Sequence, residues 1–168
     1  VIFAVLAFSR PVIKTELPAL GAHVKSSVVI LVDNSFSMEV SDGGGNRLKQ
    51  ARAAAMSVVS ALKDGDEAAI VTLTDAHSGR GTALSRNFTL LKEEIGLLKT
   101  GFAPASLENG LRTAQKILQI SSNLNKEVYI ISDAQRNIFP RKESDSLRLF
   151  DERTAVFTVP LGASDVAD

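Results

Sequence analysis

The sequence contains no cysteine, and this absence removes several kinds of chemistry at once. A chain of 168 residues without cysteine has no disulfide bond, no thiolate metal site and no nucleophilic thiol. Its two histidines are too few for a multi-histidine zinc site. The lack of cysteine does not identify the compartment, because many exported bacterial proteins also lack it.

An excess of charge of either sign is absent as well. The chain has 19 basic and 19 acidic residues, so its formal net charge is zero and no bulk electrostatic attraction points to nucleic acid. Hydrophobic residues make up 45% and charged residues 23%, an ordinary globular balance. A chain of this length is sufficient for one domain with a substantial core.

No hydrophobic run in the chain is long enough to cross a bilayer by itself. Residues 1–8 are all apolar, and Ser9, Arg10 and Pro11 end the run. Because a membrane helix takes about 20 residues, the segment is either a buried strand, a core helix or the end of a membrane helix that begins upstream. A signal peptide is a further alternative, although the polar residues that follow make a poor cleavage site.

Residues 28–37 combine a buried strand with candidate metal ligands. Five apolar residues, 28–32, are followed by Asp33, and Ser35 and Ser37 come at alternate positions after it. The continuous apolar run predicts a strand covered on both faces, at the centre of a parallel sheet. Ligand sites of such sheets lie at the carboxyl ends of the strands. A carboxylate and two hydroxyls offer hard oxygen ligands, which suit Mg²⁺ better than Zn²⁺.

The remaining pattern alternates helices with strands. A glycine-rich loop at 41–46 is not a phosphate-binding loop, because no Gly-Lys-Ser/Thr follows it. The pattern then predicts helices at 47–63, 90–99, 106–120 and 146–152, strands at 68–74, 127–132 and 154–161, and a short edge strand at 82–85. This order predicts an α/β fold with a doubly wound, mostly parallel sheet, one antiparallel edge strand and helices on both faces.

A second acid, Asp133, follows the predicted strand at 127–132. The carboxyl ends of parallel strands meet at one rim, so Asp33 and Asp133 are expected side by side. A single Asp after a strand more often caps the next turn. Two such acids, together with Ser35 and Ser37, favour a cation site.

These residues resemble a known family. The run Asp33-Asn34-Ser35-Phe36-Ser37 is similar to the Asp-x-Ser-x-Ser signature of the von Willebrand factor A (vWA) domain, whose metal-ion-dependent adhesion site (MIDAS) binds Mg²⁺ or Mn²⁺. The resemblance covers about residues 26–162 and implies a Rossmann-like vWA fold. It implies that Ser35 and Ser37 bind the metal directly and that Asp33 binds it directly or through water. Asp133 matches the later acid of the family.

The resemblance fails at one ligand. The family supplies a Thr from the loop before the third helix, and here that position falls at Ala105, which has no ligand atom. The neighbouring Ser106 either substitutes for it or serves only as the N-cap of the helix, which is the commoner role. Mg²⁺ keeps waters readily, so four protein groups can still bind it more weakly, or the site is degenerate.

A narrower resemblance concerns the N-terminus. Residues 7–11 and 131–136 are similar to bacterial membrane-anchored vWA proteins of the aerotolerance (Bat-type) group. This implies that residues 1–10 end a transmembrane helix, 11–26 connect it to a vWA domain at 27–162, and 163–168 begin a further segment of a longer protein. It also implies a place at the bacterial cytoplasmic membrane, with the domain on the periplasmic or extracytoplasmic side.

The sequence is compatible with three functions. The leading one is a non-enzymatic, membrane-anchored module that binds a carboxylate of another envelope protein through Mg²⁺, with no nucleic-acid partner. The second is a structural assembly domain with a vestigial metal site. The third, a remote one, is an aspartyl-phosphate type hydrolase, which usually needs a second acid where Ser35 stands. Phe36 and Phe139 could add apolar contact at the rim, although we expect Phe36 to be buried.

Overall fold

A computed structural model of the chain describes residues 24–42, 45–76, 83–133, 150 and 153–161. Residues 1–10, 163–168 and most of the helix predicted at 146–152 lie outside this part, as do the glycines at 43–44 and Phe139. None of the described helices combines the length and hydrophobicity that crossing a membrane requires.

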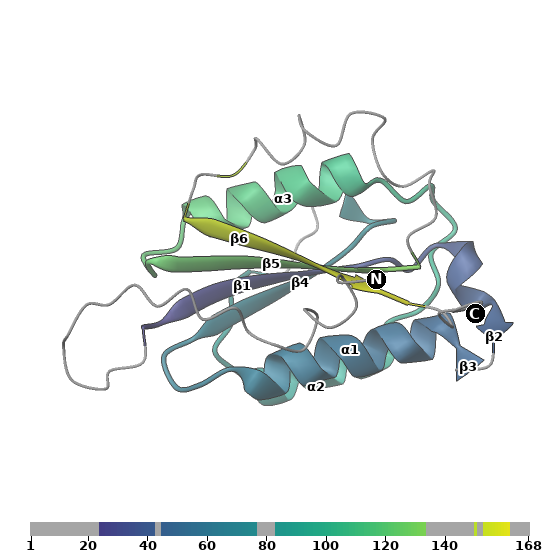
Figure 1. The fold of residues 1–168 in the computed structure, drawn as a ribbon, viewed down its shortest axis with the longest axis horizontal. Helices are drawn as coiled ribbons and strands as arrows, with labels where there is room; N and C mark the ends of the chain where they lie inside the picture. Colours follow the sequence, from purple (N-terminus) through teal and green to yellow (C-terminus); the bar gives the residue numbers. More distant parts are fainter. Residues whose placement is uncertain (1–23, 43–44, 77–82, 134–149, 151–152, 162–168) are drawn as a thin grey trace, which may run out of the picture.

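Four parallel strands form the main sheet (Figure 1). Their order is β4 (Glu67–Thr72), β1 (Ser26–Val32), β5 (Asn125–Ser132) and β6 (Thr154–Pro160). All seven residues of β1 are buried, and this strand pairs with a neighbour on each side. The predicted buried central strand is therefore confirmed.

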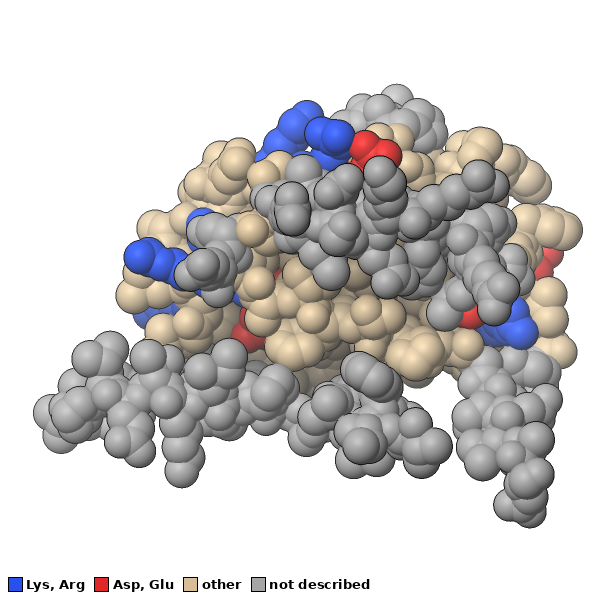
Figure 2. All heavy atoms as spheres, turned by 45° about the horizontal axis from the view of Figure 1, so that its top comes forward, with Lys and Arg blue, Asp and Glu red and all other residues tan. Residues whose placement is uncertain are grey.

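Helices cover both faces of the sheet. Helices α1 (Arg47–Ala61) and α2 (Phe88–Leu97) lie below it in Figure 1, and α3 (Leu107–Gln119) lies above it. The predicted mixed α/β architecture with two covered faces is thus present. On the face shown in Figure 2, basic and acidic side chains are interspersed, with no continuous basic surface among the described residues in this view.

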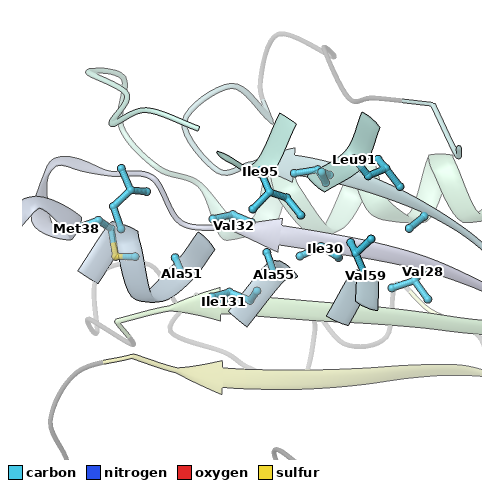
Figure 3. Packing of buried hydrophobic residues seen from close by; sticks show 13 residues of the cluster. Val28, Ile30, Val32, Met38, Ala51, Ala55, Val59, Leu91, Ile95 and Ile131 are labelled. Carbon is cyan, nitrogen blue, oxygen red and sulfur yellow. The ribbon is translucent and has the colours of Figure 1, made fainter. Parts of the chain in front are cut away.

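Alternate residues of β1 pack into two different cores. Val28, Ile30 and Val32 pack with α1 and α2, and Figure 3 shows this cluster around Ile30. Val29 and Leu31 point to the other face and pack with α3. Because successive side chains of a strand point to opposite faces, both sets must be apolar, and this explains the uninterrupted hydrophobic run.

Helix boundaries follow the capping residues. The helix predicted at 90–99 begins two residues earlier, because the side chain of Asn87 accepts a hydrogen bond from the Leu90 N–H at 3.1 Å and caps the helix there. Ser106 caps α3 as predicted, with its Oγ accepting from the Asn109 N–H at 3.3 Å.

Short antiparallel β-structure occurs in one predicted loop and at the predicted edge strand. Residues 41–46, expected to be a flexible loop, include the antiparallel pair β2 (Ser41–Asp42) and β3 (Gly45–Asn46). Gly45 has a φ of +92°, a conformation that favours glycine. The antiparallel edge expected at 82–85 appears, in the described residues, as a single bridge between Ser85 and Ala68.

Candidate metal centre

The candidate site lies where β1 and β5 end. The backbone N–H of Asp33 donates to the Ile131 carbonyl at 2.8 Å, so the end of β1 is joined to the end of β5. The Ser132 hydroxyl donates to Asp33 Oδ2 at 2.9 Å, and Asp133 is the next residue. The structure therefore places the two predicted acids on the same rim.

Asp33 carries a buried charge with neutral partners. Its exposed fraction is 0%, and its Oδ1 accepts a hydrogen bond from the Ser35 N–H at 2.9 Å. Its other oxygen accepts from the Ser132 hydroxyl. No basic side chain of the described residues forms an ion pair with it. Burying an ionised carboxylate costs free energy unless a positive charge compensates it. A cation bound at this rim would provide that charge.

The two serines lie together beside this acid. After Asp33 the chain forms a short 3₁₀ helix, η1 (Phe36–Glu39), in which the Met38 N–H donates to the Ser35 carbonyl at 3.0 Å. The hydroxyl oxygens of Ser35 and Ser37 are consequently 2.9 Å apart. This is a hydrogen-bond distance, and it is also about the separation of neighbouring oxygens around an octahedral Mg²⁺. The Asp33 half of the site therefore fits a hard divalent cation.

Asp133 already has a cationic partner. Its side chain is 0% exposed, and its Oδ2 lies 3.0 Å from Nη1 of Arg47, which is 22% exposed. This contact was not predicted from the sequence. A signal was available, because a cation at a helix N-terminus is electrostatically unfavourable and calls for an acidic partner.

The fifth candidate, Ser106, serves another purpose. Its hydroxyl caps α3, and its N–H donates to the Leu73 carbonyl at 3.2 Å. The neighbouring Ala105 is half-buried against the core beneath α3. Within the described residues, the Ser106 hydroxyl makes no hydrogen bond to Asp33, Ser35, Ser37 or Asp133, and no group of three or more His, Cys, Asp or Glu side chains is assembled there.

Two phenylalanines, one in the Asp33–Ser37 segment and one in a loop bonded to it, are exposed. The expectation that Phe36 is buried was wrong, since it is 67% exposed while Met38, two residues on, fills the core position. Sequence reasoning also missed Phe102, which is 96% exposed. Phe102 follows Gly101, whose N–H donates to the Asn34 carbonyl at 2.8 Å, so its loop is attached to the Asp33–Ser37 segment.

A comparison with protein families identifies the domain. Residues 28–135 match the family model described as the von Willebrand factor type A domain. The chain belongs to the vWA family. No curated protein matches the chain.

Solved structures share the vWA fold at low sequence identity. A vWA protein from Catenulispora acidiphila is 18% identical, with a TM-score of 0.61 over 80% of this chain and 32% of that one. The type V pili tip protein Mfa5 from Porphyromonas gingivalis is 23% identical, with a TM-score of 0.52 over 66% of this chain and 20% of that one. The adhesive tip pilin GBS104 from Streptococcus agalactiae is 16% identical, with a TM-score of 0.55 over 66% of this chain and 46% of that one. The chain spans less than half of each of them.

Asn34 connects three segments of the vWA rim. Its Oδ1 accepts hydrogen bonds from the N–H of Thr74 at 3.2 Å and from its hydroxyl at 2.9 Å. Its Nδ2 donates to the Lys99 carbonyl at 3.1 Å. A Cβ added at Gly101 would lie 2.1 Å from Thr74 Oγ1, so only glycine fits beside this connection. Asn34 therefore fixes the loops after β4 and α2 against the candidate ligands.

Replacing Asn34 with Ala should destabilise the domain, because it leaves several buried polar groups without partners. We expect the free energy of unfolding, measured by urea denaturation, to fall by about 2–4 kcal/mol. Asn109→Ala is the matched control, since the Asn109 side chain makes no hydrogen bond within the described residues. A loss for Asn34→Ala no larger than that of the control would contradict this role.

Proposed function

We propose that this vWA domain is a metal-assisted protein-interaction module that binds Mg²⁺, or Mn²⁺ in its place, at Asp33, Ser35 and Ser37. The observation that carries the proposal is the fully buried Asp33 carboxylate, which in the described residues accepts hydrogen bonds from neutral donors and forms no ion pair. A divalent cation would supply the missing positive charge. Asp33 would provide the charge, and Ser35 and Ser37 would provide neutral oxygens.

A metal at this rim would have few protein ligands and would keep coordination positions for water or a partner. When bound, the ion offers a Lewis-acidic position that a carboxylate of another protein can enter. The exposed rings of Phe36 and Phe102 would add apolar contact with the partner. Asn34 would hold the Phe102 loop in place through its bonds to the neighbouring loops.

Two structures with the same fold are consistent with this proposal. They are a type V pili tip protein from Porphyromonas gingivalis and an adhesive tip pilin from Streptococcus agalactiae. We further propose a partner in the bacterial envelope, attachment to the cytoplasmic membrane through residues 1–10 and an extracytoplasmic domain. These last points rest on the Bat-type resemblance of residues 7–11 and 131–136.

A second candidate is a structural assembly domain with a vestigial metal site. Ala105 at the expected Thr position and the contact of Asp133 with Arg47 favour this alternative. We propose no enzymatic reaction, because an aspartyl-phosphate mechanism lacks its second acid at Ser35. Metal binding separates the two remaining candidates.

Titration calorimetry with Mn²⁺ tests the metal proposal. We expect Asp33→Asn to reduce the affinity at least about tenfold, because it removes the negative charge nearest the serines while preserving the shape of the side chain. Asp64→Asn removes one charge from an exposed position at the opposite end of the sheet and should bind like the wild type. Equal affinities for wild type and Asp33→Asn, or no binding by the wild type, would favour the structural candidate.

Acetate is a suitable probe for the proposed carboxylate position. In the Mn²⁺-loaded domain, we expect the paramagnetic ion to increase the proton relaxation rate of the acetate methyl group, because the carboxylate enters the metal shell. Acetamide has a similar size and no charge, and it should relax much less. The difference should disappear in Asp33→Asn. Equal relaxation of acetate and acetamide in the wild-type domain would contradict the carboxylate proposal.

A further inference from the structure

The ion pair between Arg47 and Asp133 joins the start of α1 to the second acid of the rim. Arg47 is the first residue of α1, and the first turn of this helix contains no acidic residue. A cation at that position is unfavourable, because the helix N-terminus already carries partial positive charge. The contact with Asp133 offsets this cost. The position of Arg47 is therefore unfavourable for its own helix and is stabilised by the ion pair with Asp133 at the rim.

The backbone around Arg47 is attached to the segment that carries the two serines. The Arg47 N–H donates to the Val40 carbonyl at 3.1 Å. Asn46 caps α1 by accepting from the Lys49 N–H at 3.1 Å, and its Nδ2 donates to the Glu39 carbonyl at 3.1 Å. Because η1 ends at Glu39, Arg47 and Ser37 belong to one hydrogen-bonded unit. The backbone at the start of α1 is thus attached to the segment that carries the candidate ligands.

The two acids of the rim differ in whether a positively charged side chain neutralises their negative charge. The side chain of Asp133 is fully buried and forms an ion pair with the Arg47 side chain, which is 22% exposed. Asp33 is fully buried and contacts only neutral donors of the described residues. A divalent cation at the serines would meet one free negative charge, one neutralised acid and one neighbouring positive charge. Arg47 therefore lowers the electrostatic attraction of the whole rim for a second cation.

We propose that Arg47 is a resident counter-ion that antagonises metal binding at this rim. It withholds Asp133 from the metal and repels the incoming charge, so the rim keeps its fold without metal and binds a divalent cation weakly. This inference rests on the proposed metal site and adds its regulation. Removal of the guanidinium should therefore change metal affinity and metal-free stability in opposite directions.

Arg47→Gln is the direct test, with Mn²⁺ as the probe. We expect the dissociation constant from calorimetry to fall about tenfold or more, because the positive charge beside the second acid of the rim is lost. In metal-free buffer the melting temperature should fall by about 5–10 °C, since a buried carboxylate loses the ion pair with Arg47. Saturating Mn²⁺ should restore most of that loss. An affinity equal to or weaker than that of the wild type would overturn the inference.

Three control variants separate the charge from other effects. Arg47→Lys keeps the positive charge and should bind Mn²⁺ no more tightly than the wild type. The double variant with Arg47→Gln and Asp133→Asn has the wild-type net charge, and its gain in affinity should vanish. Arg86→Gln removes an Arg that pairs with Glu67 at the opposite end of the sheet and should leave affinity unchanged. A tenfold gain in any of these controls would overturn the role of the buried pair.

The experiment also distinguishes this inference from the proposed function. Binding by the wild type without a gain in Arg47→Gln would overturn the counter-ion role and leave the metal site intact. Binding by Arg47→Gln alone would support the counter-ion role and show that the native rim is not a working metal site. Should Arg47→Gln be unfolded without metal, recovery of the fold in Mn²⁺ supports the inference. If Arg47→Gln stays unfolded in Mn²⁺ while the double variant with Arg47→Gln and Asp133→Asn is folded, the inference is overturned.

Discussion

Asp33 ends the central strand with a carboxylate that is completely enclosed by protein. A buried ion of this kind loses several kcal/mol of hydration, and hydrogen bonds from Ser35 and Ser132 recover only part of that loss. The rest of the rim can be understood from this constraint. The turn after β1 presents two hydroxyls beside the charge, whereas the neighbouring Asp133 receives a guanidinium.

The surrounding fold holds Asp33 and the end of β1 in a fixed position. Because β1 contributes alternate side chains to two separate cores, it cannot shift along its axis without disrupting both. At its end, Asn34 joins the loops that follow β4 and α2 through its side chain and its carbonyl. The polar groups of the rim are consequently held by the most deeply buried part of the molecule. The exposed Phe36 and Phe102 belong to segments that these hydrogen bonds hold in place.

Much of this arrangement could be predicted from the sequence. The apolar run at 28–32, the acids that end two strands and the Asp-x-Ser-x-Ser signature indicated the vWA fold and the shared rim. The role of Ser106 as a helix cap followed from its position before a helix. These features depend on local periodicity and on a topology that parallel sheets impose.

Contacts between distant segments could not be predicted in the same way. Arg47 and Asp133 are 86 residues apart, and only the folded chain shows that a helix N-terminus approaches the end of β5. The exposure of Phe36 depends on which of two nearby apolar residues the turn directs inward, and Met38 takes that position. Helix α2 begins two residues before its predicted start, because the side chain of Asn87 caps the helix there.

We propose that the Asp33 half of the rim binds a divalent cation while the ion pair between Arg47 and Asp133 persists. Anomalous diffraction from crystals of the domain grown with Mn²⁺ measures this most directly. We expect a peak in contact with the hydroxyl oxygens of Ser35 and Ser37, with the ion pair between Arg47 and Asp133 intact. A peak that Asp133 ligates after leaving Arg47, or no peak at the serines, would contradict it.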